Sequence, residues 1–173
     1  MTEGFAHDLR IDSIRDGDRL DLMADEAERR AVAKRLGLGS IERLEAHATL
    51  ERNGELVRAE GRLVAALEQS CVVTGEPVPA HVDEPFSLLF RPEPEPAADE
   101  ELELGGEDCD TAFYDGGSID LGSAIADSLA LSLDPYPRSA EADAALKDAG
   151  VMSEEQASPF AALAALKKGF EGP

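Results

Sequence analysis

The pair Asn53-Gly54 separates two long runs of alternating apolar and polar residues. Alternation with a period of two is typical of a strand with one buried face, and Asn-Gly tolerates the positive φ angles of a type I′ turn. The sequence therefore predicts a β-hairpin over residues 44–67. The apolar positions that carry this prediction are Leu44, Ala46, Ala48 and Leu50 before the pair, and Val57, Ala59, Leu63, Ala65 and Leu67 after it.

A third strand is expected beyond the turn Thr74-Gly75-Glu76-Pro77, and the second strand is expected to continue toward Val73 before that turn. Pro85 interrupts the alternation of the third run and indicates a bulge or an edge strand. Residues 44 to 91 are thus predicted to form an antiparallel β-meander. The apolar residues of the third run are Val82, Phe86, Leu88 and Phe90.

Helices are expected before and after the meander in the sequence, and they are predicted to pack around it. Residues 24–36 have acidic side chains at their start and basic ones at their end, which complements the helix dipole, and Gly37 follows as a stop. Asp120 can cap a second helix that begins at Leu121 and ends at Asp134-Pro135. Residues 158–169 are predicted to form a short C-terminal helix, which must dock on the core or on a partner to be stable. The fold class is α+β.

The length of 173 residues suits a single domain over 1–173, and no stretch has the roughly 18 consecutive apolar residues of a membrane span. The first residues are acidic and lack the apolar core of a signal peptide, so a cytoplasmic location is expected. Two cysteines, Cys71 and Cys109, are expected to be free thiols there.

The net charge of −21 is distributed unevenly. Residues 1–68 carry 15 acidic and 11 basic side chains, whereas residues 69–173 carry 22 acidic and 5 basic ones. Residues 92–117 are predicted to be an acidic mobile loop, in which Thr111-Ala112-Phe113-Tyr114 could form a short strand. Because phosphate is repelled by such charge, any direct RNA contact is expected in the N-terminal half.

No familiar catalytic or metal-binding motif occurs in the chain. His7, His47, His81 and the two cysteines are scattered, and the sequence has neither a nucleophile elbow nor a phosphate-binding glycine loop. The prediction is a protein that is not an enzyme, with no cofactor, no metal and no small-molecule substrate.

A basic cluster in the first predicted helix is one candidate binding site. Arg30 and Lys34 are four residues apart and share a face with Arg29, so the three could contact phosphates together. Glu26 precedes Arg30 by four residues and could pair with it instead. Both interpretations, RNA contact and an internally paired helix surface, stay open.

The turn after the second strand is the other candidate. Gln69, Thr74 and Glu76 could form a recognition patch for a protein or an RNA, and Cys71 and Asp120 belong to the same set of possible partner-binding residues. Alternatively, these residues specify the fold alone, with Gly75 supplying a positive φ angle and Cys71 serving as a small apolar side chain on a buried strand.

The chain contains, in order, the Arg-rich helix with Leu36-Gly37-Leu38, the run Gln69-Ser70-Cys71-Val72-Val73-Thr74-Gly75-Glu76-Pro77-Val78, the acidic insertion, Ile119-Asp120-Leu121, Asp134-Pro135-Tyr136-Pro137-Arg138, and Ser158-Pro159-Phe160 with its helix. Taken together, these segments resemble the YceD family, a group of small bacterial proteins associated with accumulation of large-subunit ribosomal RNA. The resemblance extends from about Phe5 to Lys168. Many members carry Cys-x-x-Cys at the turn, which would be half of a four-ligand zinc site. This chain keeps Cys71 but has Thr74 at the second position, which argues against zinc.

The resemblance implies a non-enzymatic factor that supports 23S ribosomal RNA accumulation and ribosome biogenesis. The acidic charge favours a basic ribosomal or rRNA-processing protein as the partner, with direct RNA contact through the Arg29 to Arg35 helix as the other route. An acidic module that mimics nucleic-acid charge is a competing interpretation. An enzyme with a nonstandard carboxylate site is a third, although no pair of acids stands out.

Chelation is expected to leave the thermal stability of the protein unchanged, because one cysteine at the turn leaves too few ligands for a closed tetrahedral site. Melting curves with and without EDTA check this expectation. A melting temperature that falls by several degrees with EDTA and recovers with zinc would contradict it.

Overall fold

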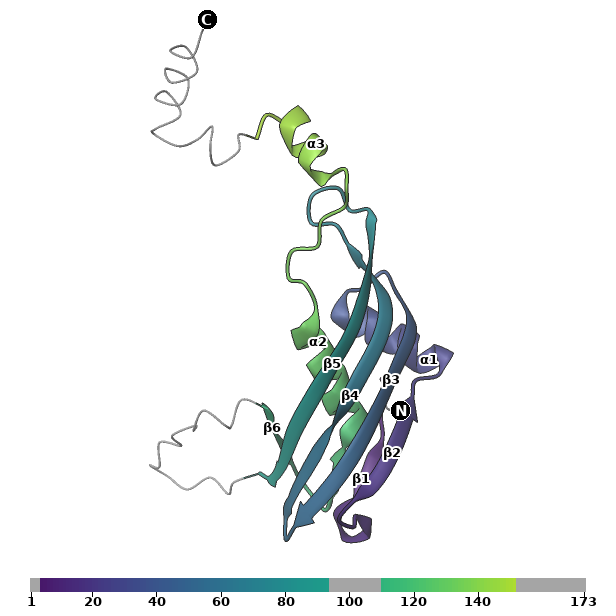
Figure 1. Ribbon diagram of the computed structural model, residues 1–173, viewed down its shortest axis with the longest axis vertical. Helices are drawn as coiled ribbons and strands as arrows, with labels where there is room; N and C mark the ends of the chain where they lie inside the picture. The colour runs from purple at the N-terminus through teal and green to yellow at the C-terminus, as the bar shows by residue number, and fades with distance from the viewer. Residues whose placement is uncertain (1–3, 94–109, 152–173) are drawn as a thin grey trace, which may run out of the picture. The chain divides into compact units, whose positions relative to one another are not determined.

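The alternating runs around Asn53 are two long paired strands in the computed structural model, which describes residues 4–93 and 110–151 (Figure 1). Strand β3 (Ser40–Asn53) pairs with β4 (Leu56–Ser70) in an antiparallel register that begins at Asn53 opposite Leu56. Gly54 has a φ angle of 65°, as the turn requires. The predicted hairpin is confirmed.

The hairpin is the centre of a five-stranded sheet with the order β2-β3-β4-β5-β6. Strand β2 (Asp18–Met23) is antiparallel to β3, and β6 (Thr111–Tyr114) is parallel to β5 (Pro77–Pro92). The α+β class and the meander are therefore confirmed, as is the short strand expected at Thr111. Strand β2 was not predicted from the sequence.

The acidic segment over 92–117, which was predicted to be a loop, contains strand residues, because β5 extends through Pro92 and β6 lies within the segment. Residues 94–109 of that segment lie outside the described residues. Strand β4 ends at Ser70 rather than near Val73, so Cys71 begins the turn. Pro85 lies on a stretch of β5 that β6 does not reach, since β6 pairs only with Leu89–Pro92 among the described residues.

A second, two-stranded sheet joins β1 (Asp8–Arg10) to β7 (Ser118–Asp120). A short 3-10 turn, η1 (Ile11–Ser13), follows β1. The pairing holds the N-terminal segment against the start of the next helix, and these strands are too short to have been predicted from periodicity.

Helix α1 (Glu26–Leu36) starts two residues later than expected, because Asp25 is its N-cap. The Asp25 side chain accepts a hydrogen bond from the Glu28 backbone and Glu28 accepts one from the Asp25 backbone, each at 2.8 Å. Gly37 ends the helix with a φ angle of 67°, as predicted.

Helix α2 (Leu121–Ser132) begins at Leu121 with Asp120 as its cap, as predicted. It ends at Ser132, just before the expected Asp134-Pro135 stop. Helix α3 (Ala142–Asp148) was not predicted, and the helix predicted over 158–169 lies outside the described residues.

The apolar core lies between one face of the main sheet and the helices α1 and α2, which are drawn behind that sheet in Figure 1. Apolar side chains of β3 and β4 are buried at every second position, while their neighbours in sequence are mostly exposed. The largest fully buried side chains are Val32, Leu44, Leu50, Val57, Leu63, Ile119, Leu121, Ile125 and Leu129.

The chain divides into two compact units, one comprising Met1–Gln69 and Pro79–Pro135, the other comprising Ser70–Val78 and Tyr136–Pro173. The expectation of a single domain over 1–173 stays a prediction. Within the described ranges, no helix combines the length and the apolar character needed to cross a membrane.

Gly61 of β4 is the glycine with least room in the described chain, because a Cβ atom there would lie 1.8 Å from the backbone oxygen of His47. We expect Gly61→Ala to lower the free energy of unfolding by on the order of 3 kcal/mol, since the β3 backbone would have to move. Chemical denaturation measures the change. Gly39→Ala is the control, because its nearest contact would be an ordinary 3.4 Å; equal effects of the two substitutions would refute the close approach.

Candidate functional site

The turn between β4 and β5 brings three of the predicted site residues together. The Gly75 backbone donates to the Cys71 carbonyl at 2.9 Å, and the Cys71 backbone donates to the Glu76 carbonyl at 2.8 Å. Gly75 has a φ angle of 75°, which glycine adopts without strain. Cys71, Thr74 and Glu76 therefore belong to one closed turn.

Cys71 is buried within this turn, with 3% of its surface exposed. Its Sγ atom accepts hydrogen bonds from two backbone amides, Thr74 at 3.4 Å and Ser139 at 3.3 Å. One of the two interpretations of the sequence made Cys71 a small apolar side chain on a buried strand. Its burial agrees with that interpretation, but the sulfur is also a hydrogen-bond acceptor at the junction of two segments.

The pKa of the Cys71 thiol is the most perturbed among the described groups. Burial alone would raise it, but the hydrogen bonds from Thr74 and Ser139 outweigh burial and lower the pKa from 9.0 to about 6. The thiolate form is thus favoured near neutral pH, and it is held where few reagents can reach it.

Three side-chain oxygens form a second set of contacts beside the thiol. Thr74 donates to the Glu76 carboxylate at 3.0 Å and Ser139 donates to the same oxygen at 2.9 Å, while the Thr74 and Ser139 hydroxyls are 3.2 Å apart. The Val72 backbone also donates to the Pro137 carbonyl at 2.9 Å. We call Cys71, Thr74, Glu76 and Ser139 the turn cluster.

The turn cluster links the β4–β5 turn to residues 137–139, which are more than sixty positions away in the chain. Ser139 was missed in the sequence analysis, since a serine after Pro137 has no distinctive spacing to the turn. The available donors do not fit a closed zinc site, because one thiolate and one carboxylate stand beside two hydroxyls that are weak zinc ligands. Among the described residues, no group of three or more His, Cys, Asp or Glu side chains could hold a metal.

The basic residues of α1 are largely engaged within the protein. Arg30 is paired with Glu26, as the helical spacing suggested, and Arg29 donates to the Ala24 carbonyl at 2.8 Å. Arg35 reaches Asp127 of α2 at 2.9 Å. Lys34 has no ion-pair partner among the described residues.

A surface hollow of about 530 Å³ lies beside α1. Arg29, Arg30 and Lys34 line it together with Glu26, and Ala33 and Ile41 are among its apolar walls. The predicted basic cluster is thus brought to one concave surface, although two of its three cations already have intramolecular partners.

The two other predicted residues are engaged in the fold. Gln69 is buried, and its side-chain amide donates to the Asp134 carbonyl at 2.8 Å. Asp120 accepts hydrogen bonds from the backbones of Ser123 at 3.0 Å and His7 at 2.9 Å. Asp120 therefore caps α2 and holds the N-terminal segment at the same time.

These features define a small α+β protein whose described surface offers hollows and paired side chains. A protein-family model named "Large ribosomal RNA subunit accumulation protein YceD" matches residues 59–167, which is more than half of the chain, so the protein belongs to the YceD family. Membership implies a role in large ribosomal RNA subunit accumulation. The searches of curated proteins and of solved structures found no match.

The ionisation of Cys71 is expected to make stability depend on pH. Between about pH 6 and pH 9.0 the folded state holds a thiolate while the unfolded state still holds a thiol, so stability should rise with pH across this range. The contribution should be fully present above pH 9.0 and lost as the pH falls through about 6.

Urea denaturation under reducing conditions measures this dependence, in a Cys109→Ser background that leaves a single thiol. The background protein should gain stability with rising pH more steeply than the same protein with Cys71→Ala. Parallel pH profiles of the two proteins would show that folding does not lower the pKa of the Cys71 thiol.

Proposed function

We propose that the protein supports accumulation of large-subunit ribosomal RNA by binding a basic ribosomal or rRNA-processing protein, without catalysing a reaction. The observation that carries this proposal is the engagement of the α1 cations by their own chain. Arg30 is paired with Glu26, Arg35 with Asp127, and Arg29 with a backbone carbonyl. Contact with phosphate would have to compete with these interactions.

The charge distribution supports a basic protein partner. Residues 69–173 carry 22 acidic and 5 basic side chains, so this half repels a phosphate polymer and attracts cationic surfaces. RNA affinity depends mainly on counterion release by Lys and Arg contacts. Lys34 is the one member of the predicted basic cluster without a partner in the described residues, and a single contact contributes little.

The outer face of the main sheet argues against the alternative of nucleic-acid mimicry. Along that face, Asp21 contacts His47 at 2.6 Å and Arg62 contacts Asp83 at 2.5 Å. The hydrogen bond from Arg62 lowers the pKa of Asp83, so the acid stays ionised beside its cation. A mimic of phosphate charge needs a continuous acidic surface, whereas Arg62 places a cation among the acids of this face.

A pull-down from lysate, with and without nuclease, tests the proposal. If a basic protein is the bridge, it should be recovered after nuclease treatment, and the triple variant Arg29→Gln, Arg30→Gln, Lys34→Gln should still recover it. Loss of binding by this variant would place the contact on α1.

The matched control removes three cations elsewhere, Arg15→Gln, Arg19→Gln and Lys147→Gln, so that both variants lose the same charge. Purified protein provides the decisive comparison with RNA. Tight RNA binding at physiological salt, which falls steeply with added salt and is lost in the α1 variant but not in the control, would overturn the protein-bridge account.

A further inference from the structure

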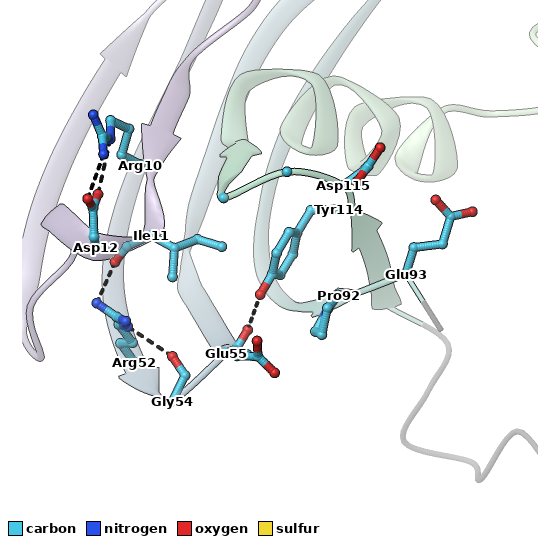
Figure 2. A pocket seen from close by; sticks show the side chains of 12 residues that line it. Arg10, Ile11, Asp12, Arg52, Gly54, Glu55, Pro92, Glu93, Tyr114 and Asp115 are labelled. Atoms are coloured by element: carbon cyan, nitrogen blue, oxygen red, sulfur yellow. Dashed lines mark hydrogen bonds and ion pairs between the residues drawn. The ribbon is translucent and has the colours of Figure 1, made fainter. Parts of the chain in front are cut away.

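A second hollow, of about 470 Å³, lies at the end of the main sheet where four separate parts of the chain meet (Figure 2). Its walls come from the η1 turn, the end of the β3–β4 hairpin, the end of β5, and the segment that follows β6. All of these belong to the same compact unit. We call it the Tyr114 hollow.

Tyr114 is the aromatic side chain of this hollow. Its hydroxyl donates a 2.6 Å hydrogen bond to the Glu55 backbone carbonyl, which fixes the ring against the tip of the hairpin (Figure 2). Burial and the nearby Glu55 raise the pKa of Tyr114, so the hydroxyl keeps its proton. Ile11, which is buried, and the half-buried Pro92 add apolar surface to the same hollow.

Both arginines of the hollow are already engaged. Arg10 donates two hydrogen bonds to the carboxylate of Asp12, at 2.6 and 3.1 Å. Arg52 donates to the carbonyl of Ile11 at 2.7 Å and to that of Gly54 at 2.9 Å. Asp12 neutralises Arg10, whereas Arg52 donates to neutral carbonyls and keeps its positive charge, so the three remaining acids of the hollow outnumber its one uncompensated cation.

Three carboxylates line the Tyr114 hollow without such engagement. The side chains of Glu55, Glu93 and Asp115 have no ion pair or hydrogen bond among the described residues. They do not form a group that could hold a metal ion within the described chain. The hollow thus combines spread negative charge with an aromatic ring and apolar walls, which suits an extended organic cation better than a compact ion.

We propose that the Tyr114 hollow binds an arginine side chain of the basic protein partner, with its aliphatic stem against Ile11 and Pro92 and its guanidinium near the Tyr114 ring and the free carboxylates. A guanidinium is planar, stacks on aromatic rings and binds carboxylates, and its stem can cover apolar surface. This inference rests on the proposed function, since it names the surface that a basic partner would use.

Fluorescence anisotropy with a labelled hexapeptide of alternating Gly and Arg tests the hollow directly. The triple variant Glu55→Gln, Glu93→Gln, Asp115→Asn should weaken binding about tenfold, because three charge contacts are lost together. The control variant Glu42→Gln, Glu84→Gln, Asp148→Asn loses the same charge from other exposed positions and should bind within about twofold of wild type. Equal losses in both variants would overturn the proposal, because they would show attraction by net charge alone.

Two substitutions of Tyr114 separate the ring from its hydroxyl. Tyr114→Phe keeps the ring and should bind the peptide as wild type does, whereas Tyr114→Leu should bind about threefold more weakly. Circular dichroism confirms that each variant is folded. A peptide with citrulline in place of arginine has nearly the same shape without charge and should not bind; binding as tight as that of the arginine peptide would also overturn the proposal.

Ribosomal RNA levels in a strain that lacks the gene distinguish this proposal from the proposed function. If the deletion does not lower the level of large-subunit ribosomal RNA, the proposed function is contradicted. The peptide measurements would still decide whether the hollow binds arginine. If the deletion lowers the level of this RNA, the triple variant Glu55→Gln, Glu93→Gln, Asp115→Asn should restore the level poorly, and the matched control variant should restore it fully. Full restoration by the triple variant would contradict arginine binding at the hollow but not the proposed function.

Discussion

The rest of the fold depends on the antiparallel pairing of β3 with β4. Because these strands are long and alternate in polarity, their pairing creates one apolar face, and burial of that face is the main driving force for α1 and α2 to pack beside it. Gly61 permits the close approach of the two backbones near His47. The turn of this hairpin also lines the Tyr114 hollow, where the backbone carbonyl of Glu55 accepts a hydrogen bond from the Tyr114 hydroxyl.

The turn after β4 is held together by a network of hydrogen bonds. The Cys71 sulfur accepts two backbone amides, and Glu76 accepts the hydroxyls of Thr74 and Ser139. Charge-assisted hydrogen bonds are directional, and the contacts to the Cys71 sulfur are partly buried, so together they can join two distant segments. The same contacts account for the low pKa of Cys71, which connects the local structure to the protonation state.

Charged side chains on some surfaces are paired within the chain, whereas those on other surfaces are available to a partner. Several cationic side chains of α1 and of the outer face of the main sheet form ion pairs, for example Arg30 with Glu26 and Arg62 with Asp83. Such exposed pairs contribute little stability, but they reduce the local potential. The carboxylates of Glu55, Glu93 and Asp115 lack these partners, so the Tyr114 hollow keeps a net negative charge even with Arg52 among its lining residues.

The sequence by itself determined the hairpin, the third strand, the α+β class, the Gly37 stop of α1 and the Asp120 cap of α2, and it offered the pairing of Glu26 with Arg30 as one of two interpretations. These follow from local rules, since alternation, turn residues and helical spacing act over a few positions. The strands β1 and β7 and the helix α3 could not be predicted, because their patterns are too short, and β2 was missed although it has six residues. Only the tertiary structure decided that Ser139 meets Cys71 and that Tyr114 meets Glu55, because such contacts depend on how distant segments pack.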